Sequence, residues 1–163
     1  MKLDLREIID VPGGRVSFSQ EFSTERLGSP SIVRYDAGPS AGGVVENTAG
    51  VLTARGSIDA RLTCLCDRCG AEFGMDKHLD FAVPVVPAGE SEDPEAFELE
   101  GDWLDMDDLL ETVYILDMDT KYLCRPDCKG VCPECGKNLN DGPCDCRKKP
   151  DPRLAVLEQL LDK

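Results

Sequence analysis

The sequence lacks most of the features that mark an enzyme or a membrane protein. It has one histidine, His78, and neither a Gly-rich phosphate-binding loop nor a Gly-x-Ser-x-Gly nucleophile elbow. A lone histidine in a strand is more often a packed or surface residue than a general base. Its apolar runs are all shorter than the ~18–20 residues that a membrane span needs. We therefore expect neither an enzyme nor a membrane protein, and no small-molecule substrate.

The first ten residues, MKLDLREIID, have no basic n-region, no apolar h-region and no cleavage site. We therefore expect a cytoplasmic protein, in a compartment where thiols stay reduced and structural disulfides are rare. The chain nevertheless has nine cysteines. An odd number of cysteines in a reducing compartment argues against a disulfide framework and for metal binding or redox chemistry.

Basic residues are few, and the shortage is local. The chain has 32 acidic residues against 18 Lys and Arg, a net charge of −14. Thirteen of the acids lie between Gly89 and Thr120, a stretch without any Lys or Arg, and the other nineteen nearly balance the basic residues. This one segment therefore carries the imbalance, and its charge repels nucleic acid and attracts a basic partner.

Four carboxylates near the middle of that segment have two interpretations. They are Asp102, Asp105, Asp107 and Asp108. Clustered carboxylates hold magnesium in some nucleases, but acids also cap helices and stabilise the first turn. We favour capping by Asp105, with the other carboxylates on a solvated face.

Residues 1–88 show the alternation of strands. KLDLREI and RVSFSQEF alternate apolar and polar residues, and GGVVENTAGVLTARGSIDARLTCLC predicts two or three strands separated by glycine. AEFGMDKHLDFAVPVV is either a hairpin or one long bent strand. The pattern predicts an antiparallel sheet or a small barrel.

Two helices are expected beyond the acidic residues. The first begins after Asp105 and places Leu109, Leu110, Val113 and Leu116 on one face. The second begins at Pro152 and carries a leucine stripe. We therefore expect an α+β fold in three parts: a β-rich domain over 1–88 that carries the first cysteine pair, an acidic linker over 89–103, and a helix, a zinc-binding segment and a C-terminal helix over 104–163.

Cysteine spacing is the most specific signal in the chain. The octets CDRCGAEF and CPECGKNL share the form Cys-x-x-Cys-Gly, in which two thiolates on a tight turn reach one metal ion and the glycine permits a positive φ. Two further pairs, Cys124/Cys128 and Cys144/Cys146, bring the total to eight thiols. Eight thiols supply two tetrahedral zinc sites and leave Cys64 over. The expected ligands are Cys66, Cys69, Cys124, Cys128, Cys132, Cys135, Cys144 and Cys146.

Sequence does not force one partition of these ligands. We favour a compact site made by the last four cysteines and a second site made by Cys66, Cys69, Cys124 and Cys128, which ties the β domain to the C-terminal segment. The two knuckles could instead share one ion, as in a zinc ribbon, or the chain could bind a single zinc. Iron–sulfur ligation uses similar thiols, and a redox Cys-x-x-Cys normally opens a helix in a βαβ unit; the paired Cys-Gly knuckles fit structural zinc better.

The sequence around the C-terminal cysteines also resembles that of a known protein family. DCKGVCPECGKNLN, with the following CDC and DPRLAVLEQL, is similar to the signature of the bacterial YceD family, the large ribosomal RNA subunit accumulation proteins. The CDRC at 66–69 and the acidic helix LDMDDLLETVYILD fall where that family carries its own Cys-x-x-Cys and helix. The resemblance covers most of the chain and is most specific from Asp127 to Leu160. Some members keep the first cysteine pair and lose later ones, which supports a separable second site.

The resemblance implies a small non-enzymatic factor that supports the accumulation of large-subunit ribosomal RNA. We expect it to bind a basic ribosomal protein or another factor associated with large-subunit rRNA, with direct RNA contact left open. Members are often encoded beside a large-subunit ribosomal protein gene. The alternative is a redox-responsive sensor or chaperone, whose zinc thiolates oxidise and release the metal.

Overall fold

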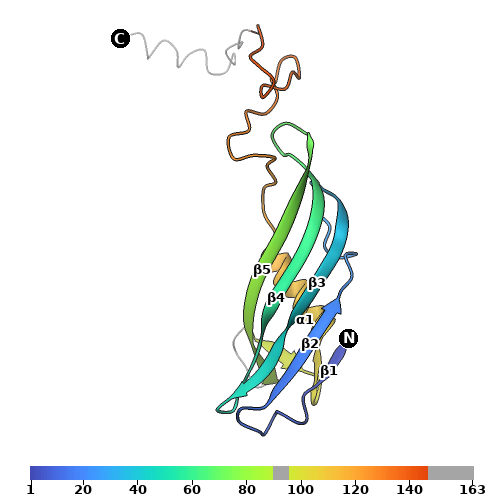
Figure 1. Cartoon of the computed structure of the whole chain (residues 1–163), viewed down its shortest axis with the longest axis vertical. Helices are drawn as coiled ribbons and strands as arrows, with labels where there is room; N and C mark the ends of the chain where they lie inside the picture. The colour runs from blue at the N-terminus through green and yellow to red at the C-terminus, as the bar shows by residue number, and fades with distance from the viewer. Residues whose placement is uncertain (90–95, 147–163) are drawn as a thin grey trace, which may run out of the picture.

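The computed structural model of the chain describes residues 1–89 and 96–146, and these residues are mainly β (Figure 1). The elements are β1 (Lys2–Asp4), β2 (Arg15–Glu21), β3 (Ile32–Thr48), β4 (Val51–Leu65), β5 (Glu72–Pro87), β6 (Phe97–Leu99), β7 (Trp103–Asp105) and α1 (Met106–Leu116). A five-stranded sheet has the order β2-β3-β4-β5-β6, and β1 pairs with β7 in a small antiparallel ribbon. All neighbours in the large sheet are antiparallel except β5 and β6, which are parallel.

The expected α+β class with two helices is wrong. The described residues form one helix, α1, against seven strands, so this is a β-rich fold with a cysteine-rich C-terminal region. The second predicted helix, at 152–161, lies outside the described residues. Within the segment 89–103 that was expected to be a linker, Phe97–Leu99 form β6 and pair with β5. Helix α1, the one helix of the described residues, is not long and apolar enough to cross a bilayer.

Three long strands form the centre of the sheet. β3 and β4 are joined by a two-residue turn at Ala49-Gly50, where both residues have positive φ, 54° and 92°. Two positive φ values are the requirement of the hairpin turn whose twist matches its strands. The stretch AEFGMDKHLDFAVPVV forms one long strand and not a hairpin. Its pairing with β4 keeps one continuous register, from Glu72 opposite Leu65 to Val85 opposite Leu52.

Of the glycines expected to separate strands, Gly50 does so in the turn between β3 and β4, whereas Gly42, Gly43 and Gly56 lie inside the strands. Gly43 of β3 pairs directly with Gly56 of β4, and Phe18 of β2 lies on the other side of Gly43. A Cβ on Gly43 would stand 2.1 Å from the Arg55 carbonyl oxygen and 2.8 Å from Cζ of Phe18. The two backbones approach too closely here for any side chain, and glycine at such points lets a sheet curve.

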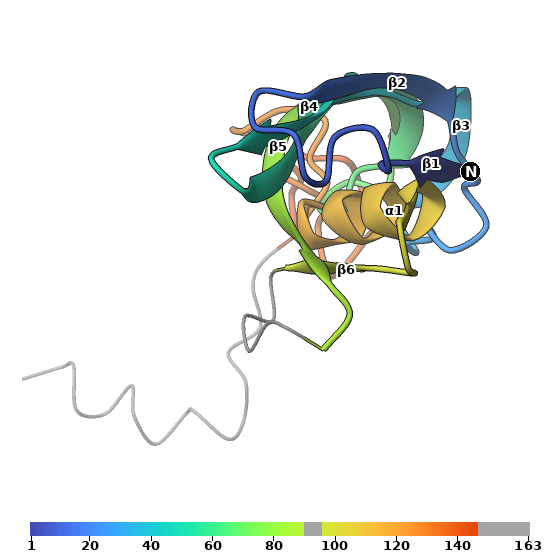
Figure 2. The same ribbon diagram turned by 90° about the horizontal axis from the view of Figure 1, so that it is seen from below.

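Helix α1 lies within the curve of this sheet, with β2 above it and β6 below it in Figure 2. Asp105 is its N-cap and accepts hydrogen bonds from the N–H groups of Asp107 and Asp108, which confirms the predicted capping. Leu109 and Leu110 are fully buried against the sheet, whereas Leu116 is 81% exposed. Leu116 was expected on the same apolar face as Leu109 and Leu110, but it is exposed at the end of the helix.

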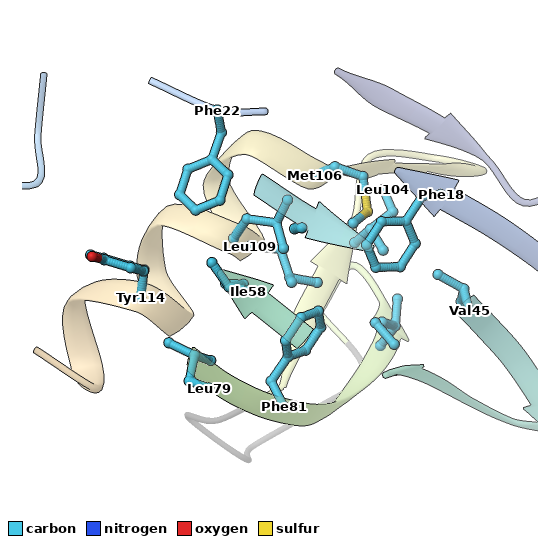
Figure 3. Packing of buried hydrophobic residues seen from close by; sticks show 14 of the residues in the cluster. Phe18, Phe22, Val45, Ile58, Leu79, Phe81, Leu104, Met106, Leu109 and Tyr114 are labelled. Atoms are coloured by element: carbon cyan, nitrogen blue, oxygen red, sulfur yellow. The ribbon is translucent and has the colours of Figure 1, made fainter. Parts of the chain in front are cut away.

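The core fills the space between α1 and the inward face of the sheet (Figure 3). The residues labelled there belong to this core: Phe18, Phe22, Val45, Ile58, Leu79, Phe81, Leu104, Met106, Leu109 and Tyr114. Every second residue of β4 from Leu52 to Cys64 is buried except Gly56, which is half-buried; on the opposite face only Thr63 is buried. Lys77 of β5 fixes the end of α1 by donating to the carbonyl oxygen of Asp117 at 2.7 Å and pairing with its carboxylate at 2.6 Å.

The substitution Gly43→Ala should destabilise the fold by about 2 kcal/mol or more, because the added methyl group meets backbone that no rotamer change can move. Gly42→Ala is the matched control, since a Cβ at Gly42 has no atom within 4 Å. Urea unfolding of both variants measures the difference. Equal midpoints for the two would contradict the close approach of β3 and β4.

His78 should titrate above its ordinary range. A hydrogen bond and charge attraction from Asp59, whose carboxylate lies 2.7 Å from Nδ1, raise the pKa of His78 above 6.5. The imidazolium form therefore adds stability that is fully present below pH 6.5 and is lost as the pH rises through the folded pKa. NMR titration should show the pKa of His78 falling toward 6.5 in Asp59→Asn. A parent pKa at or below 6.5 would refute the pairing.

Candidate metal centres

The two Cys-x-x-Cys-Gly octets fold into the same turn. In the first, the N–H of Gly70 donates to the carbonyl oxygen of Cys66 at 2.8 Å, and in the second the N–H of Gly136 donates to that of Cys132 at 2.8 Å. Both glycines have positive φ, 69° and 71°. The first cysteine of each octet also donates its own N–H five residues ahead, to Ala71 and to Lys137. The two octets, which share one motif in the sequence, therefore also share one backbone structure.

The eight predicted ligands come together as two groups of four. One group is Cys66, Cys69, Cys124 and Cys128, and the other is Cys132, Cys135, Cys144 and Cys146; within each group the sulfur atoms lie within 4.8 Å of one another. This is the partition that the sequence favoured, and it separates the two knuckles from each other. We call these groups the first and the second cysteine cluster.

Sulfur spacing in the first cluster fits a tetrahedral metal. The Sγ atoms of Cys66 and Cys128 are 3.7 Å apart, and those of Cys69 and Cys124 are 3.8 Å apart. A zinc ion with four sulfurs at ~2.3 Å places those sulfurs ~3.8 Å from one another. A disulfide requires ~2.05 Å, and all nine cysteines are free. The residues therefore fit a structural Zn²⁺, which would supply the positive charge that holds four thiolates together.

The end of the β4–β5 hairpin carries Cys66 and Cys69, and three contacts bring the chain after α1 to it. The N–H of Asp67 donates to the Tyr122 carbonyl oxygen at 2.8 Å, and the Asp67 carboxylate accepts from the Tyr122 N–H at 2.6 Å. Nη1 of Arg68 donates to the carbonyl oxygen of Cys128 at 2.8 Å. Gly130 passes so close that a Cβ there would lie 2.9 Å from the Arg68 carbonyl oxygen.

Thiol acidity within the first cluster is uneven. Burial opposes ionisation of Cys66, but the backbone N–H groups of Cys124 and Cys69 outweigh burial and lower the pKa of Cys66 to about 6. Burial and the neighbouring sulfurs raise the pKa of Cys124 to about 12. One sulfur is thus readily ionised while another keeps its proton, because four negative sulfurs repel at this spacing without a cation.

The second cluster repeats this pattern. The N–H groups of Cys135 and Glu134 lower the pKa of Cys132 to about 7. The Cys135 sulfur raises the pKa of Cys146 to about 12. Cys132 is buried, whereas Cys135 and Cys146 are exposed. The second cluster therefore lies nearer the surface than the first.

Asn140 connects the clusters and was not foreseen from the sequence. It belongs to the loop between Cys135 and Cys144, yet its Nδ2 donates to Sγ of Cys128 in the first cluster at 3.2 Å. Its Oδ1 accepts from the N–H of Lys129 at 2.9 Å. The only sequence signal is an Asn in a tight Asn-Leu-Asn-Asp-Gly loop, which predicts a turn but not a contact with a sulfur.

Cys64 belongs to neither cluster. It is fully buried in the core on the inward face of β4, and burial raises the pKa of its thiol. A buried free cysteine acts as a small apolar residue. Cys64 lies within β4, which ends at Leu65, whereas the ligand Cys66 follows the end of the strand.

The fold and these two clusters define a β-sheet protein with two groups of four cysteines, and a tetrahedral metal ion in either group would form a closed site, with every position filled by sulfur. A closed site stabilises structure and offers no open position for water or substrate. The chain belongs to the YceD family: the family model described as large ribosomal RNA subunit accumulation protein YceD matches residues 54–161, which include all nine cysteines. The resemblance seen in the sequence is thereby confirmed.

Relatives of the chain include uncharacterized proteins of Mycobacterium bovis and Mycobacterium tuberculosis, each 32% identical over 122 residues, covering 72% of this chain and 59% of theirs. A protein of Arabidopsis thaliana, the large ribosomal RNA subunit accumulation protein YCED homolog 1, chloroplastic, is 25% identical over 141 residues, covering 66% of this chain and 44% of its own. The matched part thus spans little more than half the length of the mycobacterial relatives and less than half that of the Arabidopsis relative. No solved structure is significantly similar to this chain.

Elemental analysis of protein purified without chelator should give two zinc ions per chain. Cys66→Ser and Cys132→Ser should each lose one, because each removes one ligand from a different cluster. Cys64→Ala should keep both ions and lose about 1 kcal/mol of stability through the small cavity that it leaves. Loss of a metal ion in Cys64→Ala would contradict this grouping.

Asn140→Asp should weaken metal retention at the first cluster about 10- to 100-fold, the usual range for a partner that hydrogen-bonds to a ligand. The aspartate still accepts from Lys129 but cannot donate to Cys128, and it adds negative charge beside the sulfur. Competition with a chromogenic chelator measures the change. Asp127→Asn is the control, since Asp127 lies between two ligands but its carboxylate pairs with Arg125 at 3.6 Å. Equal retention in both variants would contradict the role of Asn140.

Proposed function

We propose that this chain is a non-enzymatic, zinc-braced factor of ribosome biogenesis that supports the accumulation of large-subunit ribosomal RNA in the cytoplasm. The observation that carries the proposal is the match of the family model over both cysteine clusters. The family description and the name of the Arabidopsis relative both refer to accumulation of that RNA. What the clusters add is a way to hold the chain after Tyr122 at the end of the β4–β5 hairpin.

A structural role for the metal follows from the chemistry of the clusters. Each offers four sulfurs and no further ligand, so a bound zinc would brace the backbone and leave no coordination position for a reaction. Bracing acts on the end of the β4–β5 hairpin and on the chain from Tyr122 onward, which share few other contacts than those of Asp67 and Arg68.

Three of the four carboxylates considered for magnesium have structural partners, which supports a non-enzymatic role. Asp105 caps α1. Asp107 pairs with the N-terminal amine and accepts from Gln20, and Asp108 lies 4.0 Å from Nη1 of Arg26. A nuclease would need these groups directed together at a metal ion, whereas here they bind different parts of the fold.

The charge of the chain favours a protein partner over direct contact with RNA. Six carboxylates of the acidic segment are paired with cations elsewhere in the fold: Glu100, Asp107, Asp108, Glu111, Asp117 and Asp119. The net charge nevertheless stays at −14. A surface of that sign repels phosphate and steers a basic protein, such as a ribosomal protein, toward the molecule.

Deletion of the gene in its own organism should lower large-subunit rRNA relative to small-subunit rRNA, measured on total RNA. Complementation with the parent or with Cys64→Ala should restore the ratio, whereas Cys66→Ser should not. Asp105→Asn combined with Asp108→Asn should also restore it, because no catalysis depends on these groups. An unchanged ratio after deletion would overturn the proposed function, and failure of the double aspartate variant at normal protein levels would overturn its non-enzymatic character.

A further inference from the structure

A groove of about 660 Å³ lies between β5, β6 and α1, away from the cysteine clusters. Its floor is apolar: Leu79 and Phe81 of β5 are nearly buried there, and Val113 of α1 and Phe97 of β6 are half-buried beside them. Leu116, at the end of α1, stands at its lip with 81% of its surface exposed. A volume of this size holds several side chains of a bound segment.

One wall of the groove is a strand edge. β5 pairs with β6 only from Val85 to Pro87, so from Glu72 to Pro84 its second edge has no strand partner among the described residues. Five consecutive residues, 79–83, line the groove. Successive side chains of a strand point to opposite faces of the sheet, so a groove on one face meets only every second side chain. Five consecutive residues line this groove because it follows the edge of the strand. A free edge beside an apolar groove accepts an extended segment as an added strand.

The rim of the groove is acidic. Asp80, Glu98, Asp108 and Asp117 line it, and it has no Lys or Arg in its lining. Asp117 is paired with Lys77, and Asp108 lies 4.0 Å from Arg26. Asp80 and Glu98 have no Lys or Arg within ion-pair distance among the described residues; Asp80 lies 3.5 Å from Nε2 of His78. Two carboxylates thus remain to attract a positively charged occupant.

We propose that this groove binds an extended segment of a large-subunit ribosomal protein in which apolar residues alternate with Lys or Arg. The apolar side chains face Leu79, Phe81 and Leu116, the backbone pairs with the free edge of β5, and the basic side chains meet Asp80 and Glu98. The occupant is a protein segment because phosphate would meet only carboxylates and apolar atoms here. The inference rests on the proposed function, since that function supplies the class of partner.

The test uses the isotope-labelled full chain with zinc, titrated with synthetic peptides that cover the tails of the large-subunit ribosomal proteins from the same organism. A binding peptide should shift the amide signals of Leu79, Phe81 and Leu116, and its sequence should alternate apolar and basic residues. Leu116→Lys should weaken its binding about tenfold or more, about 1.4 kcal/mol. Leu116 is so exposed that this change removes little from the core. Val11→Lys, at an apolar residue that is 51% exposed and outside the groove, should bind as the parent does.

Electrostatic recognition has its own pair of variants. Asp80→Asn combined with Glu98→Gln should weaken binding and flatten its salt dependence, whereas Asp127→Asn, a change of the same kind outside the groove, should do neither. The proposal is overturned if no peptide binds, if the shifts fall on the cysteine clusters, or if Leu116→Lys binds like the parent. It is also overturned if a second copy of the chain or the segment 147–163 occupies the groove. In the absence of peptide, a second copy would be revealed by shifts at Leu79 and Phe81 on dilution, and the segment by shifts at the same residues on truncation after Cys146.

The rRNA ratio separates this proposal from the one on which it rests. If deletion of the gene lowers the ratio and Leu116→Lys restores it fully, the groove proposal fails and the proposed function stands. If deletion leaves the ratio unchanged, the proposed function fails whatever the peptides do. If both proposals hold, Leu116→Lys should fold, bind two zinc ions and still leave the ratio low.

Discussion

Four sulfur atoms from two distant parts of the chain meet at the end of the β4–β5 hairpin, where hydrogen bonds of Asp67 and Arg68 also hold the chain that follows α1. The sheet and α1 have a core of their own, built from long strands and a short helix. The segment after Tyr122 has almost none: of its described residues, 123–146, only Cys128, Gly130 and Cys132 are buried. So little apolar burial offsets little conformational entropy, and we expect a metal ion in each cysteine cluster to take the place of a core there.

The molecule therefore has two ends with different sources of order. At the sheet, order comes from apolar packing and from ion pairs that connect the acidic helix to Arg26 and Lys77. At the cysteine end, the described contacts are two clusters of sulfur atoms, two identical turns and the hydrogen bonds of Asn140. The groove beside α1 belongs to the first end. A partner bound there would leave the braced end exposed to further contacts.

Local features could be predicted from the sequence because local rules decide them. Cysteine spacing gave the two knuckles, the Asp105 cap followed from its place before an apolar run, and alternation predicted the strands of the first half. The preferred grouping of cysteines coincides with the structure because the last four, which are close in sequence, need little loop closure to meet, and this leaves the other four for the first cluster. Whether either cluster holds zinc stays a prediction.

Features that depend on a distant partner could not be predicted. Gly43 and Gly56 resemble strand breaks when each is considered alone, and only their pairing across the sheet shows why both must lack a side chain. Periodicity placed Leu116 on the apolar face of its helix, but its exposure at the helix end depends on the rest of the fold. The parallel pairing of β6 and the reach of Asn140 to a sulfur of the other cluster likewise depend on tertiary structure.

The first cluster also sets an order of events during synthesis. Cys69 and Cys124 are separated by 55 residues, and at a translation rate of ~5–20 residues per second the first knuckle waits roughly 3–11 s for its other two ligands. The second cluster spans only the stretch from Cys132 to Cys146 and is complete almost as soon as it is made. A nascent chain thus carries an open pair of thiols for seconds, during which free metal ions, oxidants and other nascent chains compete for the knuckle at the end of β4.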